Sequence, residues 1–376
     1  MTDFAKGLEG VIAAETEMSF IDGEKGVLEY VGVPIGELAE HSNFEETVHL
    51  LWNRALPTAQ QYEAFTKELR DRYPLPGGLI DLIRAMPRGT PPMHALRTLV
   101  SATSAYDEDP NATDPERARD KALNILGYAP TIVATFDRVR KGKEIVDPDP
   151  SLSFAENFLY MLNGEKPTET MARAFDICMI LHADHGLNNS TFTARVIIST
   201  LSDVYSAMTG AIGSLRGPLH GGANEGVLHM LNDIPSVDDA EAHIMGMMER
   251  KEKIMGFGHR VYKTKDPRAF ALQGLAEQLA KDTGNEDLYA KSCRIEEVMD
   301  REVGAKGIYP NVDFYSATTY RCIGLDIDLF TPMFAMSRLG GWAGHVIEQL
   351  ADNRLFRPKA KYVGPHDCPY VPIDKR

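Results

Sequence analysis

The sequence predicts an all-α fold with a minor β element at the N-terminus. From Phe44 onward, apolar residues recur at spacings of three and four, which is the period of one face of an α-helix. One short segment, Val27–Val33, has the β-branched and aromatic character of a strand. The chain has 376 residues, which is too many for one compact core of ordinary size, so two domains are expected.

The first elements are bounded by glycine and proline. The strand Val27–Val33 lies between Gly26 and Pro34, neither of which favours a strand interior. The first helix begins near Phe44, and the proline-bearing segment Leu56–Thr58 ends it. The N-terminal region is therefore expected to be short and rich in turns, with helices following it.

The rest of the chain is almost entirely helical in pattern. Helices are expected within Leu79–Met86, Met93–Tyr106, Ala118–Lys141, Thr168–His185, Thr191–Leu215, Ser292–Met299 and Thr331–Leu350, and polar loops at Asp107–Pro115 and Lys141–Pro150. Pro130 should break or kink its helix, because proline lacks the N–H that the helix needs. Small residues near Gly210 would let two helices approach closely, as in a buried hairpin or a subunit contact.

Composition narrows the class of protein. Hydrophobic residues make up 43% and charged residues 25%, as in soluble globular proteins. No run of about 18 uncharged apolar residues appears, and the first residues lack the features of a signal peptide. The four cysteines match no metal or redox spacing, and the formal net charge of -14 argues against nucleic acid as the main partner. We therefore expect a cytoplasmic protein without a membrane or nucleic-acid partner.

The segment Gly256–Arg268 has the character of an anion site. Its two glycines let the main chain approach a ligand, and His259 can exchange a proton near neutral pH. Residues 249–268 hold seven Lys or Arg against three Asp or Glu, in a chain that is acidic as a whole. Such a local reversal of charge can concentrate an anionic ligand. A surface loop with solvated charges is the alternative for any single residue here.

Two other residues have a possible catalytic role. His220 lies between Pro218 and a glycine pair, just before an expected helix, where the positive end of the helix dipole lowers a histidine pKa. A neutral His220 could donate a hydrogen bond to a developing enolate, or it could simply tie down the turn. Asp313 lies between apolar residues, and partial burial would make it a better base; it could equally be a helix cap.

His182 and His185 differ in their surroundings. His182 shares an apolar stripe with Phe175 and Met179, so we expect a core histidine. His185 begins a glycine-bearing turn where the backbone can meet a ligand. Two histidines three apart on a helix could instead share a metal ion, but no third ligand at a usual spacing completes that site.

These segments match one family in order. The motifs are His182–Ser190, Arg216–Glu225, Gly256–Arg268 and Pro310–Ser316, with Gly7–Gly10 and Ile21–Gly26 at the start and Asn353–Pro358 at the end. Together they resemble citrate synthase, of the prokaryotic dimeric type, over nearly the whole chain. The resemblance implies a large helical domain, residues 1–218 and 320–376, and a smaller inserted helical domain, residues 219–319. It also implies a homodimer with active sites in the cleft between domains, closing when substrate binds.

The resemblance assigns roles to individual residues. The catalytic set would be His220, His259 and Asp313, and the oxaloacetate ligands would be His185, Arg268, Arg338 and Arg357, the last reaching into the partner subunit's site. Lys263 and Lys306 would meet CoA phosphates. No metal or prosthetic group is implied.

The implied reaction condenses acetyl-CoA with oxaloacetate and water to give citrate and CoA. The nearest alternative is 2-methylcitrate synthase, which uses propionyl-CoA with the same residues. A helical metalloenzyme built on His182, His185 and His220 and a non-catalytic helical dimer that binds acyl-CoA or a dicarboxylate are alternatives from other classes.

Overall fold

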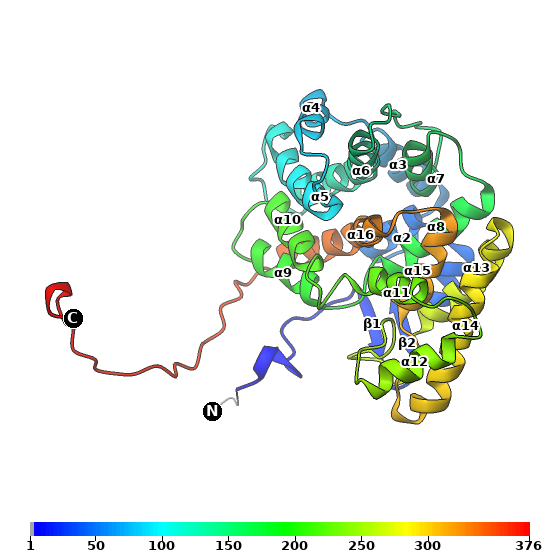
Figure 1. Cartoon of the computed structure of the whole chain (residues 1–376). Helices are drawn as coiled ribbons and strands as arrows, with labels where there is room; N and C mark the ends of the chain where they lie inside the picture. The colour runs from blue at the N-terminus through cyan, green and yellow to red at the C-terminus, as the bar shows by residue number, and fades with distance from the viewer. Residues whose placement is uncertain (1–3) are drawn as a thin grey trace.

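The computed structural model describes residues 4–376, and its architecture is helical with a small sheet near the N-terminus (Figure 1). The α-helices are α1 Ile35–His41, α2 Phe44–Asn53, α3 Ala59–Arg70, α4 Gly77–Ala85, α5 Pro92–Ala102, α6 Pro115–Arg140, α7 Phe154–Asn163, α8 Glu169–His182, α9 Asn189–Ile198, α10 Val204–Leu215, α11 Ala223–Asn232, α12 Ala240–Glu249, α13 Pro267–Thr283, α14 Glu286–Val303, α15 Val312–Ile323 and α16 Phe330–Ala351. The predicted all-α class with minor β structure is confirmed.

The sheet has three short antiparallel strands. They are β1 Ser19–Asp22, β2 Val27–Tyr30 and β3 Val33–Pro34, paired in chain order. The sequence predicted one strand over Val27–Val33. A turn divides it, because Val31 and Gly32 both adopt positive φ angles, 51° and 79°.

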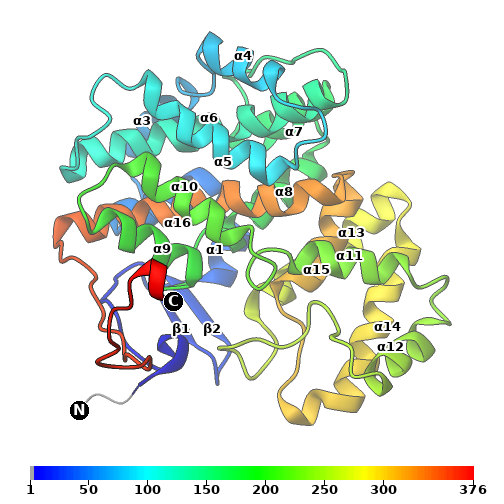
Figure 2. The same ribbon diagram turned by 60° about the vertical axis from the view of Figure 1, so that its left-hand side comes forward.

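Helix α16 runs through the middle of the molecule (Figure 2). Every residue from Phe330 to Val346 is buried, and the helix packs on α2, α6, α8, α9 and α10. A helix that is apolar on all sides belongs in a core. Because α16 contacts so many elements, a side chain on it has a fixed position relative to each of them.

Two of the predicted helices differ in detail. The run Thr191–Leu215 is two helices, α9 and α10, because Asp203 caps the second and Leu201 has a φ angle of 61° before it. A Cβ on Gly210 would lie 2.2 Å from Ile197, so the pair packs closely, as a buried hairpin requires. Helix α6 continues through Pro130, so the helix is not broken there, and the alternative, a kink at Pro130, stays a prediction.

Helices α11 to α15 pack largely on one another at one end of the molecule (Figure 1, lower right). Helix α13 lies along α15, α11 also contacts α15, and α12 packs on α14. The division into residues 1–218 with 320–376 and residues 219–319 stays a prediction. Its second boundary falls inside α15, which continues to Ile323.

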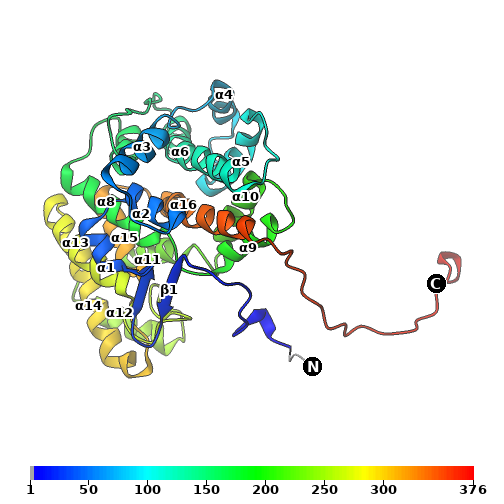
Figure 3. The same ribbon diagram turned by 180° about the vertical axis from the view of Figure 1, so that it is seen from behind.

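Both chain ends extend from the same side of the body (Figures 1 and 3). Residues 354–376 form no α-helix and are mostly exposed, including Tyr362, Val363 and Ile373. Within residues 4–376, no helix is long and apolar enough to cross a membrane.

Candidate active site

The glycine-rich signature loop lies against the start of α15. The Gly258 N–H donates to the Tyr309 carbonyl and the Asn311 N–H to the Gly256 carbonyl, each at 2.9 Å. Gly256 has a φ angle of 80°, and a Cβ there would lie 2.7 Å from Val227, so only glycine fits. This pairing brings the loop that carries His259 beside the helix that carries Asp313.

The backbone fixes the protonation of His259. Its Nδ1 accepts hydrogen bonds from the N–H groups of Val261 and Tyr262, at 3.0 and 3.2 Å. A nitrogen that accepts carries no proton, so the proton of the neutral ring is on Nε2. Burial, with Arg268 nearby, lowers the pKa of His259 to about 4. At neutral pH His259 is therefore a neutral hydrogen-bond donor through Nε2.

His220 has the opposite tautomer. It precedes α11, and its Nε2 accepts from the Ser190 N–H at 3.3 Å, with the Ser190 hydroxyl at 2.8 Å. The proton of the neutral ring is then on Nδ1. Burial, followed by the charge of Arg338, lowers the pKa of His220 to about 4.

Asp313 is in the first turn of α15, and it is not the cap of that helix. The cap is Asn311, whose side chain accepts from the Asp313 N–H at 3.0 Å. Burial raises the pKa of Asp313 to about 6, against the opposing charge of Arg268. A carboxylate with this pKa is ionised at pH 7 and is a stronger base than an ordinary one.

His185 faces the signature loop from the end of α8. Its Nε2 lies 3.1 Å from the Tyr262 hydroxyl, and its ring centre lies 5.2 Å from that of His259. Burial, followed by Arg268, holds the pKa of His185 well below its usual range. His182 is a core residue, as predicted: it has no exposed surface, and its Nδ1 lies 2.7 Å from the Cys178 carbonyl.

Two of the four predicted dicarboxylate ligands are buried arginines. Arg268 begins α13 and forms a two-pronged ion pair with Asp266, with Nε and Nη2 at 3.0 and 2.7 Å from its oxygens. Arg338 is on α16, donates from Nε to the His182 carbonyl at 2.6 Å and lies over the Phe334 ring. Both are 2% exposed.

Arg357 is in a different environment from these two arginines. It is an exposed residue of the C-terminal segment, and among residues 4–376 its side chain makes one hydrogen bond, to the adjacent Pro358 carbonyl at 3.5 Å. Within one chain it does not join the site.

The two predicted CoA-binding lysines lie near each other. Lys263 and Lys306 are both exposed, and a Cβ on Gly307 would lie 3.2 Å from the Lys263 carbonyl. The N-terminal hairpin also touches this loop, because the Lys263 N–H donates to the Gly23 carbonyl at 2.9 Å.

Sequence reasoning missed three side chains that hold the site together. Ser190 orients His220, Tyr262 meets His185, and Asp266 pairs with Arg268. All three lie inside motifs named above: Ser190 ends His182–Ser190, and Tyr262 and Asp266 lie in Gly256–Arg268. The contacts of Ser190 and Tyr262 join segments 30 and 77 residues apart, which spacing alone does not reveal. Asp266 is only two residues from Arg268, so the short spacing of these opposite charges was a signal for that pair.

The structure also bears on two other features. Among residues 4–376, no three His, Cys, Asp or Glu side chains gather as a metal ion would need, so the metal site on His182, His185 and His220 finds no support. A cavity of about 740 Å³ lies at the far ends of α11 and α15, beside His229 and Arg321. None of the candidate catalytic residues lines this cavity.

Comparison with known proteins identifies similar sequences. A family model described as "Citrate synthase, C-terminal domain" matches residues 7–359. The chain is 49% identical to the citrate synthase of Haloferax volcanii, with 100% of this chain and 99% of the relative covered. It is also 49% identical to that of Deinococcus radiodurans, with both chains fully covered. The citrate/2-methylcitrate synthase of Bacillus subtilis is 41% identical, over 96% of this chain and 97% of the relative.

Solved structures show the same fold. The citrate synthase of Thermotoga maritima superimposes with a TM-score of 0.89 at 41% identity, over 99% of each chain. That of Thermoplasma acidophilum, a ternary complex with carboxymethyl coenzyme A and oxaloacetate, superimposes with a TM-score of 0.94 at 35% identity, over 100% of each chain.

Proposed function

The chain belongs to the citrate synthase family, and from this we propose that it condenses acetyl-CoA with oxaloacetate and water to give citrate and CoA. It is thus a transferase, and its product would enter the tricarboxylic acid cycle. One observation of the site carries the proposal. Two neutral histidines with opposite tautomers, His220 and His259, accompany an aspartate whose pKa is raised, Asp313.

The first step removes a proton from the methyl group of the thioester. Asp313 accepts this proton, and the Nδ1–H of His220 donates a hydrogen bond to the thioester oxygen as negative charge develops there. A pKa of about 6 for Asp313 supports this role, because it leaves the carboxylate ionised at pH 7 and more basic than usual. Ser190 keeps the proton of His220 on the nitrogen that donates.

The second step forms the carbon–carbon bond. The enol attacks the keto carbon of oxaloacetate, whose oxygen accepts a hydrogen bond from the Nε2–H of His259. Four side chains bind the two carboxylates and fix which face of the ketone is attacked. They are Arg268, Arg338, His185 and the partner subunit's Arg357. Citryl-CoA results, and its hydrolysis releases citrate and CoA.

Further parts of the proposal concern location, assembly, binding and cofactors. The protein is cytoplasmic and acts as a homodimer. The homodimer is supported by the exposed apolar side chains of residues 354–376 and by the exposed position of Arg357, which bonds to the adjacent Pro358 carbonyl. Lys263 and Lys306 bind the phosphates of CoA. The domain of residues 219–319 closes over oxaloacetate, which therefore binds first and raises the affinity for the thioester. The reaction uses no metal or prosthetic group.

A second candidate is 2-methylcitrate synthesis from propionyl-CoA. The observation that favours it is the 41–42% identity to relatives named for that product, in Bacillus subtilis and Corynebacterium glutamicum. One methylene group changes binding in an apolar pocket by only about 1–3 kcal/mol, so small packing differences decide between the two thioesters.

The deciding experiment measures thiol release from acetyl-CoA, with and without oxaloacetate, beside the same assay with propionyl-CoA. Release that depends on oxaloacetate and is abolished by Asp313→Asn supports condensation, and the thioester with the higher kcat/KM identifies the product. If neither thioester releases thiol, the protein is instead a binder of acyl-CoA or a dicarboxylate.

The shared site is tested by mixing two inactive variants. Asp313→Asn and Arg357→Ala subunits are unfolded and refolded together. If Arg357 serves the partner's site, each mixed dimer has one intact site, and about a quarter of the wild-type activity returns. If Arg357 serves its own site, no mixed dimer has an intact site and the activity stays absent. Refolded wild-type protein gives the reference.

A further inference from the structure

One residue of the signature loop, Tyr262, contacts two of the histidines in the site. Its N–H donates to Nδ1 of His259 at 3.2 Å, and its hydroxyl lies 3.1 Å from Nε2 of His185. The three rings form a cluster, with centres 4.8 to 5.5 Å apart. The mechanism proposed above gives roles to His185 and His259 but none to Tyr262.

The turn between β1 and β2 holds Tyr262 in this place. The Lys263 N–H donates to the Gly23 carbonyl at 2.9 Å, and a Cβ on Gly23 would lie 2.1 Å from the Val261 carbonyl oxygen. The hairpin therefore lies directly against the residues on either side of Tyr262. Because Tyr262 is only 1% exposed, its hydroxyl is shielded from bulk water.

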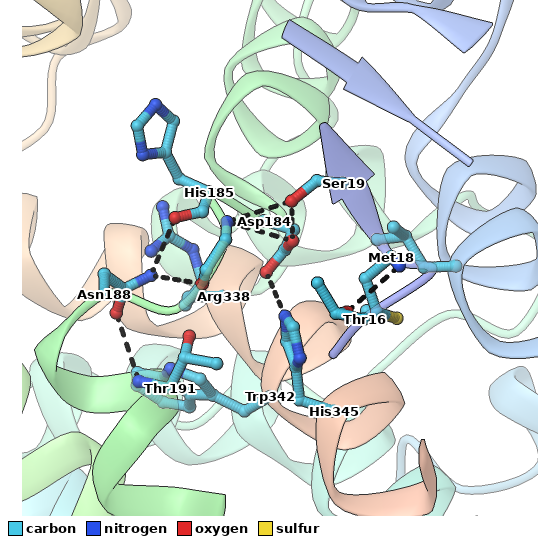
Figure 4. Close-up of polar contacts among 12 residues, drawn as sticks. Thr16, Met18, Ser19, Asp184, His185, Asn188, Thr191, Arg338, Trp342 and His345 are labelled. Carbon is cyan, nitrogen blue, oxygen red and sulfur yellow. Dashed lines mark hydrogen bonds and ion pairs between the residues drawn. The ribbon is translucent and has the colours of Figure 1, made fainter. Parts of the chain in front are cut away.

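His185 and its neighbour Asp184 point to different sides of the turn after α8 (Figure 4). The Asp184 carboxylate faces α16, where its Oδ1 lies 3.2 Å from Nε2 of His345, and neither of these side chains has any exposed surface. The His185 ring extends to the other side, where the Arg338 guanidinium also lies. The contact with α16 thus fixes the turn, and Tyr262 is the partner of the His185 ring.

The hydroxyl of Tyr262 has one hydrogen to donate. Burial raises the pKa of Tyr262, so the hydroxyl keeps its proton at neutral pH. A buried O–H without an acceptor costs free energy, and within residues 4–376 the acceptor in its reach is Nε2 of His185. This nitrogen therefore accepts the hydrogen bond and carries no proton of its own.

The other ring nitrogen of His185 then carries the proton. Burial, followed by Arg268, holds the pKa of His185 well below its usual range, so the ring is neutral at pH 7 and has one proton. With Nε2 accepting from Tyr262, that proton is on Nδ1. A carboxylate only accepts hydrogen bonds, so a neutral His185 can bind one through this N–H alone.

We propose that Tyr262 is a positioning residue that fixes the tautomer of His185, so that the Nδ1–H of His185 donates to a carboxylate of the substrate. This role rests on the function proposed above. The N–H groups of Val261 and Tyr262 hold the proton of His259 on Nε2. The same short segment therefore prepares one histidine for the carboxylate and the other for the keto oxygen.

The hydrogen bond also crosses the predicted domain boundary. His185 falls in the predicted domain of residues 1–218 and 320–376, and Tyr262 falls in that of residues 219–319. The tautomer of His185 is therefore fixed only while the signature loop lies against the end of α8. Binding of the dicarboxylate is in this way tied to the position of the loop.

Nitrogen-15 NMR of protein with labelled histidine tests the tautomer directly, because protonated and unprotonated ring nitrogens give different signals. The spectrum of His185→Asn identifies the signals of His185. The wild type should have the proton on Nδ1, and Tyr262→Phe, which removes the hydroxyl and keeps the ring, should lose this preference. His259 is the internal control, since its partners are backbone N–H groups that the substitution keeps.

The effect on binding is measured as KM for oxaloacetate, beside kcat. In Tyr262→Phe, KM should rise about fivefold, as expected for the loss of one hydrogen bond, while kcat changes by less than about twofold. Tyr128→Phe is the matched control, at a partly buried tyrosine of α6 whose hydroxyl bonds to no residue within 4–376. It should leave both values unchanged.

Three results would overturn the proposal. They are a proton on Nε2 of His185 in the wild type, a Tyr262→Phe variant that keeps the Nδ1 proton, and an unchanged KM in that variant. A merely structural role of Tyr262 predicts the second of these. If the wild type releases no thiol, the proposed function fails, whereas the NMR experiment still tests the tautomer, and calorimetry of oxaloacetate binding replaces KM.

Discussion

The two walls of the site are built differently. On one wall, which we call the binding wall, Arg338 and His345 are on α16, and Asp184, the partner of His345, lies against this helix. These side chains have almost no exposed surface, and Arg338 carries a full positive charge. The other wall, which we call the reacting wall, consists of His220, His259 and Asp313. His220 and His259 lie on loops, are partly exposed and are neutral at pH 7. The first wall can bind a dianion, and the second can give and take hydrogen bonds without holding a charge of its own.

Burial acts on both walls, but with opposite results for acids and bases. It lowers the pKa of His220 and His259 and raises that of Asp313, because in each case it disfavours the charged form. One physical cause therefore supplies a stronger base and two neutral donors in the same place. On the binding wall, ion pairs and hydrogen bonds offset that cost, and the charges remain.

The largest expected effect comes from the reacting wall alone. Asp313→Asn removes the base while keeping its size, so kcat should fall about 10³-fold. Oxaloacetate affinity, measured by calorimetry, should stay within about twofold, because the charges that bind it are untouched. A loss of affinity as large as the loss of kcat would contradict the separation of the two walls.

A change on the binding wall should have the opposite signature. Arg338→Lys loses the planar guanidinium and buries an ammonium group, so KM for oxaloacetate should rise about 10²-fold, with a much smaller fall in kcat. Arg84→Lys, at a side chain that is 60% exposed, is the matched control and should change neither value. An unchanged KM for Arg338→Lys would remove Arg338 from the binding wall.

The acid side of the pH profile sharpens the comparison. Because the pKa of Asp313 is raised to about 6, its active, ionised form is lost as the pH falls through this value. The histidines of the reacting wall stay neutral to about 4, so kcat should fall about tenfold per pH unit below about 6. A kcat that is level down to pH 4 would show that Asp313 is not the base.

The smallest expected effect is on stability. Gly256→Ala places a Cβ against Val227 at a φ angle of 80° and should destabilise the fold by about 2 kcal/mol. Gly274→Ala, within α13 and with no atom near the new Cβ, should stabilise it by about 0.5–1 kcal/mol. Denaturant unfolding of both variants gives the two values, and equal values would show that the signature loop tolerates a side chain.

The candidate residues of the reacting wall stand out in the sequence more clearly than those of the binding wall, and the roles of both sets stay predictions. Glycines, prolines and single chemical groups mark His220, His259 and Asp313, so local patterns and family motifs find them. The helical class also followed from periodicity. The division of Thr191–Leu215 into two helices did not, since the turn at Leu201 contains no glycine or proline.

The partners that orient the site were beyond reach for a physical reason. Ser190 and His220 are thirty residues apart, and Asp184 and His345 are 161 apart. Such pairs are set by how helices pack, which no local spacing encodes. In the sequence, nothing distinguishes His345 from an ordinary residue of a buried helix. Its contact with Asp184 is visible only in the structure.

The position of α16 also has a consequence for biosynthesis. Ser19, the first residue of β1, bonds to Asp184, 165 residues later. Asp184 bonds in turn to His345, near the end of α16. A chain that leaves the ribosome from its N-terminus must hold the early partners open until α16 emerges. The candidate site is therefore completed only late in translation, because a nascent chain that stops before α16 lacks both Arg338 and His345.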